Sequence, residues 1–133
     1  MKANELMIGD WVQDITSVVI DAISNEDICT YRDEHGYITA NPSNLKPITL
    51  TAEILEKNGF EEKTESNPFV YYLFKDGDNS VSLEHTYDTT DKEDYWACSI
   101  GNRLCDVCTI SMHYIHELQH ALRLCGIDKD IVL

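Results

Sequence analysis

Residues 114–122, YIHELQHAL, are the stretch from which the fold is inferred most readily. Apolar residues recur through this stretch at the three- and four-residue spacing of a helix. A glycine, Gly126, follows as a stop signal. The stretch therefore predicts a final helix from about Ser111 to Cys125. The predicted core face of this helix carries Ile115, Leu118, Leu122 and Cys125.

The chain upstream of this helix predicts a second helix and a sheet. Thr51 is typical of an N-cap, and Gly59 of a C-cap, so a short helix is expected over Ala52–Asn58. Four apolar or aromatic runs follow, and the turns between them predict two antiparallel hairpins. The runs cover residues 69–74, 80–85, 95–100 and 104–110. Residues 49–133 are thus predicted to form an α+β unit of a helix, four strands and a C-terminal helix.

The first third of the chain has the sequence pattern of short strands and turns, without a predicted helix. Residues 7–48 carry short alternating or β-branched runs, separated by turns such as His35-Gly36 and Asn41–Asn44. Several short strands at close spacing predict a small SH3-like β barrel or a curled meander. The predicted fold class is α+β, with a small β module over residues 1–48 followed by the helix–antiparallel sheet–helix unit. Whether the two halves pack as one domain is left open.

The net charge of the chain limits the classes of partner that it is expected to bind. The 133 residues include 10 Lys and Arg against 24 Asp and Glu, which gives a net charge of −14. Phosphate contacts need basic side chains, so direct nucleic-acid binding and anionic membrane surfaces are disfavoured. A protein partner is expected, and an acidic inhibitor that mimics DNA is an alternative. The sequence identifies neither the partner nor the oligomeric state.

The cellular compartment is inferred from what the sequence lacks. The residues after Met1 contain no apolar signal segment, and no apolar run is long enough to span a bilayer. The five cysteines are irregularly spaced, which is untypical of a disulfide framework. We therefore expect a cytoplasmic protein with reduced thiols.

Residues 116–120, HELQH, have the form H-E-x-x-H of zinc peptidases. On a helix, His116 and His120 share one side and can both ligate zinc, while Glu117 acts as base on a zinc-bound water. His113 adds a third imidazole to the same stripe. A zinc-dependent hydrolase that uses these residues is therefore one alternative function, with zinc as its cofactor.

Three observations favour a solvated polar helix face instead. The stripe lies opposite the predicted core face of the helix. Only 13 residues follow His120, and positions 123 and 126, Arg and Gly, do not provide the further ligand of the longer zinc-peptidase motif. The chain is also short for a substrate cleft. We therefore expect no catalytic residue and no cofactor, and we keep zinc binding by His113, His116 and His120 as the alternative.

Two further patterns are interpreted as structural. Cys105 and Cys108 form a C-x-x-C pair, but a strand would point them to opposite faces, so we interpret them as core residues. The acidic run Asp88–Asp94 lacks the central glycine of a calcium loop and is interpreted as a solvated turn.

Three segments carry a resemblance to a known group of proteins. Residues 5–12, ELMIGDWV, resemble the ELRIGNWV opening of small uncharacterised proteins from prophages and mobile elements of gut bacteria. Residues 47–55, PITLTAEIL, resemble their PIPLTEExL segment, and Lys57–Phe60 their following KxGF. Residues 114–122 are similar to their YVHQLQNLYFAL tail, in which Gln and Asn stand where this chain has Glu117 and His120.

The resemblance covers nearly the whole chain in order and implies no known activity. Because the similar tails lack H-E-x-x-H, it weakens the zinc interpretation. The expected function is that of a non-enzymatic accessory or binding protein of a phage or mobile element. The alternatives are an acidic inhibitor or DNA mimic that binds a basic host protein, and the zinc-dependent hydrolase.

Overall fold

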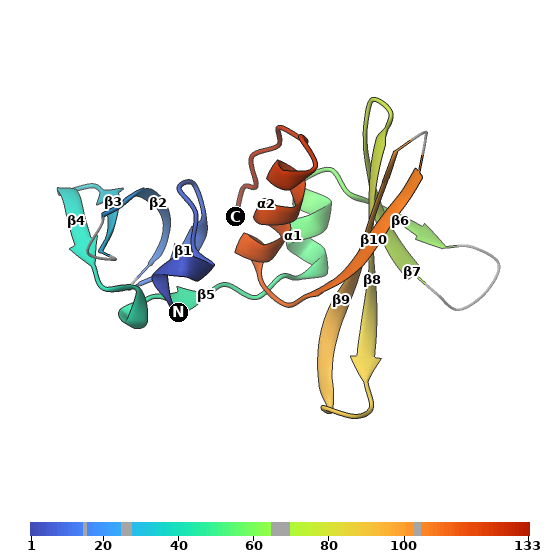
Figure 1. Cartoon of the computed structure of the whole chain (residues 1–133), viewed down its shortest axis with the longest axis horizontal. Helices are drawn as coiled ribbons and strands as arrows, with labels where there is room; N and C mark the ends of the chain where they lie inside the picture. Colours follow the sequence, from blue (N-terminus) through green and yellow to red (C-terminus); the bar gives the residue numbers. More distant parts are fainter. Residues whose placement is uncertain (15, 25–27, 65–69, 103–104) are drawn as a thin grey trace. The chain divides into compact units, whose positions relative to one another are not determined.

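The computed structural model describes residues 1–14, 16–24, 28–64, 70–102 and 105–133. These residues are mixed α+β, with two antiparallel five-stranded sheets and two α-helices (Figure 1). They divide into two compact units. The first unit is Met1–Thr49 with Tyr114–His120, and the second is Leu50–His113 with Ala121–Leu133.

The first unit is built on an open sheet. Its first four strands form a meander of antiparallel neighbours, and β5 pairs with β1 to give the order β4-β3-β2-β1-β5. In the described part of the chain no pairing joins the outer strands, so the sheet is not a closed barrel. The strands are β1 (Trp11–Gln13), β2 (Ser17–Ile23), β3 (Cys29–Asp33), β4 (Gly36–Ala40) and β5 (Lys46–Pro47), with 3-10 turns at Ala3–Glu5 and Pro42–Asn44.

Alternation along these strands gives the first unit its core. Val18 and Ile20 of β2 are buried, and so are Cys29 and Tyr31 of β3, as period-two alternation predicts. The buried cluster comprises Leu6, Val12, Val18, Ile20, Cys29, Tyr31 and Leu45.

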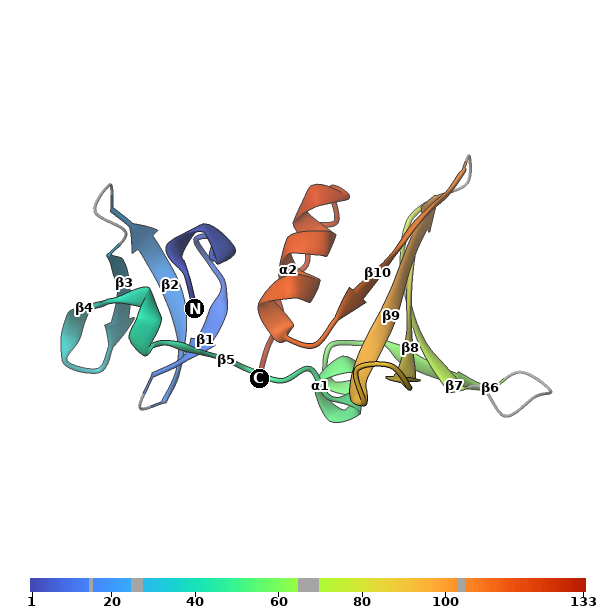
Figure 2. The same ribbon diagram turned by 60° about the horizontal axis from the view of Figure 1, so that its bottom comes forward.

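The second unit places α1 against a longer sheet of order β10-β9-β8-β7-β6. Figure 2 shows this sheet as a strongly twisted layer. Its elements are α1 (Ala52–Lys57), β6 (Glu61–Thr64), β7 (Val70–Asp76), β8 (Asn79–Asp88), β9 (Glu93–Asn102) and β10 (Cys105–Met112). The last helix, α2 (Ile115–Leu124), begins in the first unit and ends in the second. Neither α-helix of the described residues is long and apolar enough to cross a membrane.

Two predictions about this half of the chain are wrong. The sheet has five strands rather than four, because the charged run Glu61–Thr64, which lacks apolar alternation, pairs with β7 as the outer strand β6. The last helix begins at Ile115 rather than near Ser111, because β10 continues to Met112. Phe69, which was predicted to begin the aromatic strand, lies outside the described residues.

The predicted helix signals are confirmed. The Thr51 hydroxyl accepts the N–H of Ile54 at 3.4 Å, as an N-cap does. Gly59 ends α1 with a φ of +80°, and the N–H of Phe60 donates to the Leu55 carbonyl at 3.0 Å. Gly126 ends α2 in the same way, with a φ of +71°. Both ends have the Schellman pattern, in which a glycine in the left-handed region closes the helix.

The buried face of α2 supplies a stability prediction. Leu118 is fully buried, whereas Leu124 on the same helix is 81% exposed. Leu118→Ala should therefore lower the free energy of unfolding by about 2–5 kcal/mol, through lost apolar burial and the cavity left behind. Leu124→Ala is the matched control and should change it by less than about 0.5 kcal/mol. Denaturant titration measures both. Equal effects of the two substitutions would show that Leu118 is not a core residue.

Candidate functional site

Glu117 lies in the first turn of α2, where it caps the helix. Its Oε2 accepts the backbone N–H of Tyr114, the residue before the helix, at 2.9 Å. This contact is one half of a capping box, in which a carboxylate three residues into a helix satisfies an N–H at its start. Glu117 thus has a structural role that needs no metal-bound water.

His120 is paired with a buried carboxylate. Its Nε2 lies 2.7 Å from Oδ2 of Asp10, a residue with no exposed surface. Because an ionised carboxylate only accepts hydrogen bonds, Nε2 of His120 is the donor. The same Oδ2 also accepts the backbone N–H of Met7 at 2.7 Å. The Asp10 carboxylate is therefore held between the start of the chain and the helix.

Gln119 adds two hydrogen bonds to the same segment. Its Nε2 donates to the Gly9 carbonyl at 3.0 Å, and its Oε1 accepts the N–H of Trp11 at 2.9 Å. The buried amide thus contacts the backbone on both sides of Asp10, much as a neighbouring strand would. Gly9–Trp11 and the first half of α2 form one polar cluster within the first unit, which we call the Asp10 cluster.

His116 belongs to the buried part of this cluster. Its side chain is 6% exposed, and its ring lies 5.7 Å from the ring of His120, centroid to centroid. Nδ1 of His116 is buried and has no hydrogen-bond partner among the described residues. Burial lowers the pKa of His116 below its ordinary value of 6.5, against the opposing effect of the Glu117 and Asp10 carboxylates. The expectation of a solvated histidine stripe is therefore wrong at His116.

The structure brings together only part of the predicted metal set. His116 and His120 are neighbours, whereas His113 belongs to the second unit and faces the ring of Tyr95 at 6.5 Å. Within the described ranges, no three His, Cys, Asp or Glu side chains gather as metal ligands would. Nε2 of His120 is hydrogen-bonded to Asp10, and Glu117 caps the helix, so both side chains have structural roles in this geometry.

The cysteines are dispersed through the fold. Cys29 and Cys98 are buried in their sheets. Cys125 is exposed, so its predicted place on the core face of α2 is wrong. The side chains of Cys105 and Cys108 lie outside the described residues, and the prediction of reduced thiols stays a prediction.

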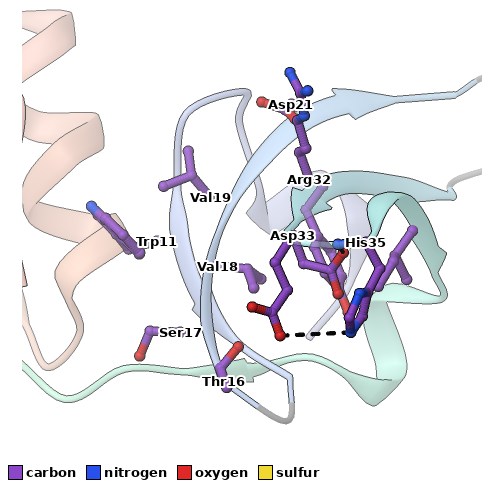
Figure 3. A pocket seen from close by; sticks show the side chains of 12 residues that line it. Trp11, Thr16, Ser17, Val18, Val19, Asp21, Arg32, Asp33 and His35 are labelled. Carbon is purple, nitrogen blue, oxygen red and sulfur yellow. Dashed lines mark hydrogen bonds and ion pairs between the residues drawn. The ribbon is translucent and has the colours of Figure 1, made fainter.

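A separate feature of the first unit is a pocket of about 700 Å³ on the first sheet. Strands β1 to β4 and the turn between β3 and β4 provide its walls. Figure 3 shows Arg32, Asp33 and His35 on one side of it, with Trp11 and Val19 on the other. Its ionisable lining residues are Asp21, Tyr31, Arg32, Asp33, Glu34 and His35.

Acidic groups outnumber basic ones around this pocket. Among the described lining residues, Asp21, Asp33 and Glu34 are acidic and Arg32 is the one with a guanidinium, which lies 5.7 Å from the Tyr37 ring centroid. His35 Nε2 lies 3.6 Å from the Glu34 carboxylate at the exposed rim. The lining therefore has a net negative charge when His35 is neutral.

Tyr31, which lines the pocket, makes a half-buried hydrogen bond. The Tyr31 hydroxyl donates to Oδ2 of Asp14. This bond, followed by burial and the nearby negative charge of Asp14 and Asp33, raises the pKa of Tyr31 to about 12. Tyr31 is therefore a neutral hydrogen-bond donor at neutral pH.

Sequence reasoning missed Asp10 and the pocket. The side-chain partner of Asp10, His120, lies 110 residues away, so no local motif contains the contact. The carboxylates of the pocket come from separate strands and a turn, so no short motif contains them. The one sequence signal related to them is the net negative charge of the chain. No family model, curated protein or solved structure matches the chain.

The buried imidazole of His116 generates a pH prediction. The unfolded chain binds a proton at His116 near the ordinary pKa of 6.5, whereas the folded chain binds it only at lower pH. The contribution of His116 to stability is therefore complete above about pH 6.5 and is lost as the pH falls below it. Denaturant titrations from about pH 7.5 to about pH 5 should show a smaller loss of stability for His116→Gln than for the unchanged chain.

His35 offers the matched control for this experiment. Its side chain is 81% exposed, so His35→Gln should leave the pH dependence of unfolding unchanged. If His116→Gln and the unchanged chain lost stability in parallel across this range, the assigned effect of burial on His116 would be wrong.

Proposed function

We propose that the chain is a non-enzymatic binding protein whose first unit takes a basic segment of a partner protein in the pocket on its first sheet. One observation carries the proposal: three carboxylates, those of Asp21, Asp33 and Glu34, line a pocket of about 700 Å³ beside a single guanidinium. Lys and Arg side chains complement such a lining. The proposal keeps the prediction that the first unit resembles an SH3-like domain, a small β unit that binds an extended peptide.

The overall charge supports the same class of partner. A net charge of −14 attracts basic proteins over distance and speeds their encounter, while the lining of the pocket decides where they dock. The resemblance to proteins of prophages and mobile elements suggests the setting, an accessory protein that meets a host or phage protein.

An acidic inhibitor that mimics DNA is the second candidate, and one observation favours it. The β8–β9 turn in the second unit brings together Asp88, Asp91, Glu93 and Asp94, with Asp88 and Glu93 directly opposite in register. Backbone N–H groups of Thr90 and Asp91 lower the pKa of Asp88, so its carboxylate stays charged at neutral pH. A row of such charges at an exposed tip is a feature that DNA-binding proteins can recognise.

Binding of an oligo-arginine peptide tests the proposal. Asp21→Asn combined with Glu34→Gln should weaken the affinity by about tenfold, because two carboxylates at the pocket are lost. Asp128→Asn combined with Asp130→Asn is the matched control, since it changes the net charge equally at exposed positions of the second unit. Isothermal titration calorimetry at two salt concentrations measures both.

The control should bind like the unchanged chain. If both double variants lost affinity equally, attraction would depend on total charge and the pocket would not be the binding site. Unchanged binding by the pocket variant, with a loss on neutralising Asp91 and Asp94, would favour the DNA-mimic function instead.

A further inference from the structure

The second unit contains its own pocket, of about 440 Å³. The start of α1 and strands β7, β8 and β9 provide its walls. Its volume lies in the range of pockets that hold small organic ligands. The described residues that line it are Leu50, Thr51, Ala52, Val70, Tyr72, His85 and Trp96.

Three aromatic rings give this pocket its character. Trp96 lies at the centre, with Tyr72 packed edge-on at 5.8 Å and His85 tilted at 5.0 Å between ring centroids. The Trp96 indole N–H donates to the Leu50 carbonyl at 3.0 Å, so its hydrogen-bonding capacity is used within the wall. What Trp96 offers to a ligand is aromatic surface.

The polar groups of the lining are few. The Thr51 hydroxyl caps α1, and burial, followed by the nearby Glu62 and Glu56 carboxylates, raises the pKa of Tyr72, so its hydroxyl stays neutral. His85 lies at the exposed rim and carries a ring nitrogen that can bond a ligand. Among the described residues, none of those that line the pocket is an Asp, Glu, Lys or Arg. A charged group buried there would lose its hydration, and no described lining side chain would offer it an opposite charge.

From these contacts we infer that the second unit has a binding site for a small, uncharged aromatic molecule, whose ring packs on Trp96 and whose polar substituent faces His85. Aromatic rings prefer the offset or edge-on arrangements that Tyr72 and His85 already adopt around Trp96. The site is distinct from the acidic pocket of the first unit and does not depend on the function proposed for it.

Three matched probes test the charge of the ligand. Benzyl alcohol is neutral, benzylamine is a cation and phenylacetate is an anion, and all three carry the same ring. Trp11 and Trp96 are the two tryptophans of the chain, so Trp11→Phe leaves Trp96 emission as the reporter. Excitation at a wavelength that tyrosine and the probes do not absorb isolates the signal. We expect a saturable change with benzyl alcohol and affinities at least about tenfold weaker for both charged probes.

Substitutions in the same background locate the binding. Ala52→Leu should fill the pocket without opposing helix formation, and His85→Ala should remove the rim partner, each weakening benzyl alcohol binding by at least about fivefold. Tyr87→Ala, on the same strand but outside the lining, should bind like the Trp11→Phe parent. Circular dichroism and denaturant titration confirm that each variant is folded.

Two results would overturn the inference. The first is the absence of a saturable signal with benzyl alcohol in the folded Trp11→Phe protein, or a signal that Ala52→Leu and His85→Ala both leave unchanged. The second is benzylamine binding as tightly as benzyl alcohol, which would identify the site as one for organic cations.

Discussion

A carboxylate buried without exposed surface must be hydrogen-bonded, and this requirement at Asp10 organises the first unit. Oδ2 of Asp10 accepts from the backbone at Met7 and from Nε2 of His120, both at 2.7 Å. Gln119 bonds the backbone on either side of Asp10, and the N–H of Ile115 donates to the Ile48 carbonyl at 2.9 Å. The first half of α2 thereby belongs with the N-terminal sheet, and the hydrogen bonds of Gln119 and His120 join residues 108 to 110 positions apart in sequence. Loss of His120 or of the Met7 N–H would leave the buried Asp10 carboxylate with an unsatisfied hydrogen-bond acceptor. We therefore expect the Asp10–His120 contact to contribute strongly to the free energy of unfolding.

The same contact explains the H-E-x-x-H pattern. The spacing that suits zinc also places His116 and His120 on one helix face, and in this structure that face meets the Asp10 carboxylate. Glu117 is occupied at the helix start. Each residue of the motif therefore has a role in packing or capping. The two pockets are lined by other residues. One has an acidic lining and the other an aromatic, uncharged one, so they suit ligands of different kinds.

Local signals in the sequence were sufficient for much of the fold. Thr51, Gly59 and Gly126 mark helix ends through contacts within a few residues, and alternation in β3 identifies its buried face. The outer strand β6 was missed because its residues are charged and its pairing with β7 is not visible in its own pattern. The burial of His116 was missed for a related reason. Helical periodicity distinguishes the polar face of a helix from its apolar face. It does not show that another segment of the chain, with matching hydrogen-bonding groups, covers the polar face. Long-range contacts such as that between Asp10 and His120 carry no local signature.

The central claim is that His120 is a structural partner of Asp10, and a double-mutant cycle tests it most directly. The free energy of unfolding is measured for the unchanged chain, Asp10→Ala, His120→Ala and the double variant, with and without added zinc. We expect a coupling free energy of about 1–3 kcal/mol between the two side chains, independent of zinc. A coupling near zero, or one that arises only when zinc is added, would contradict it.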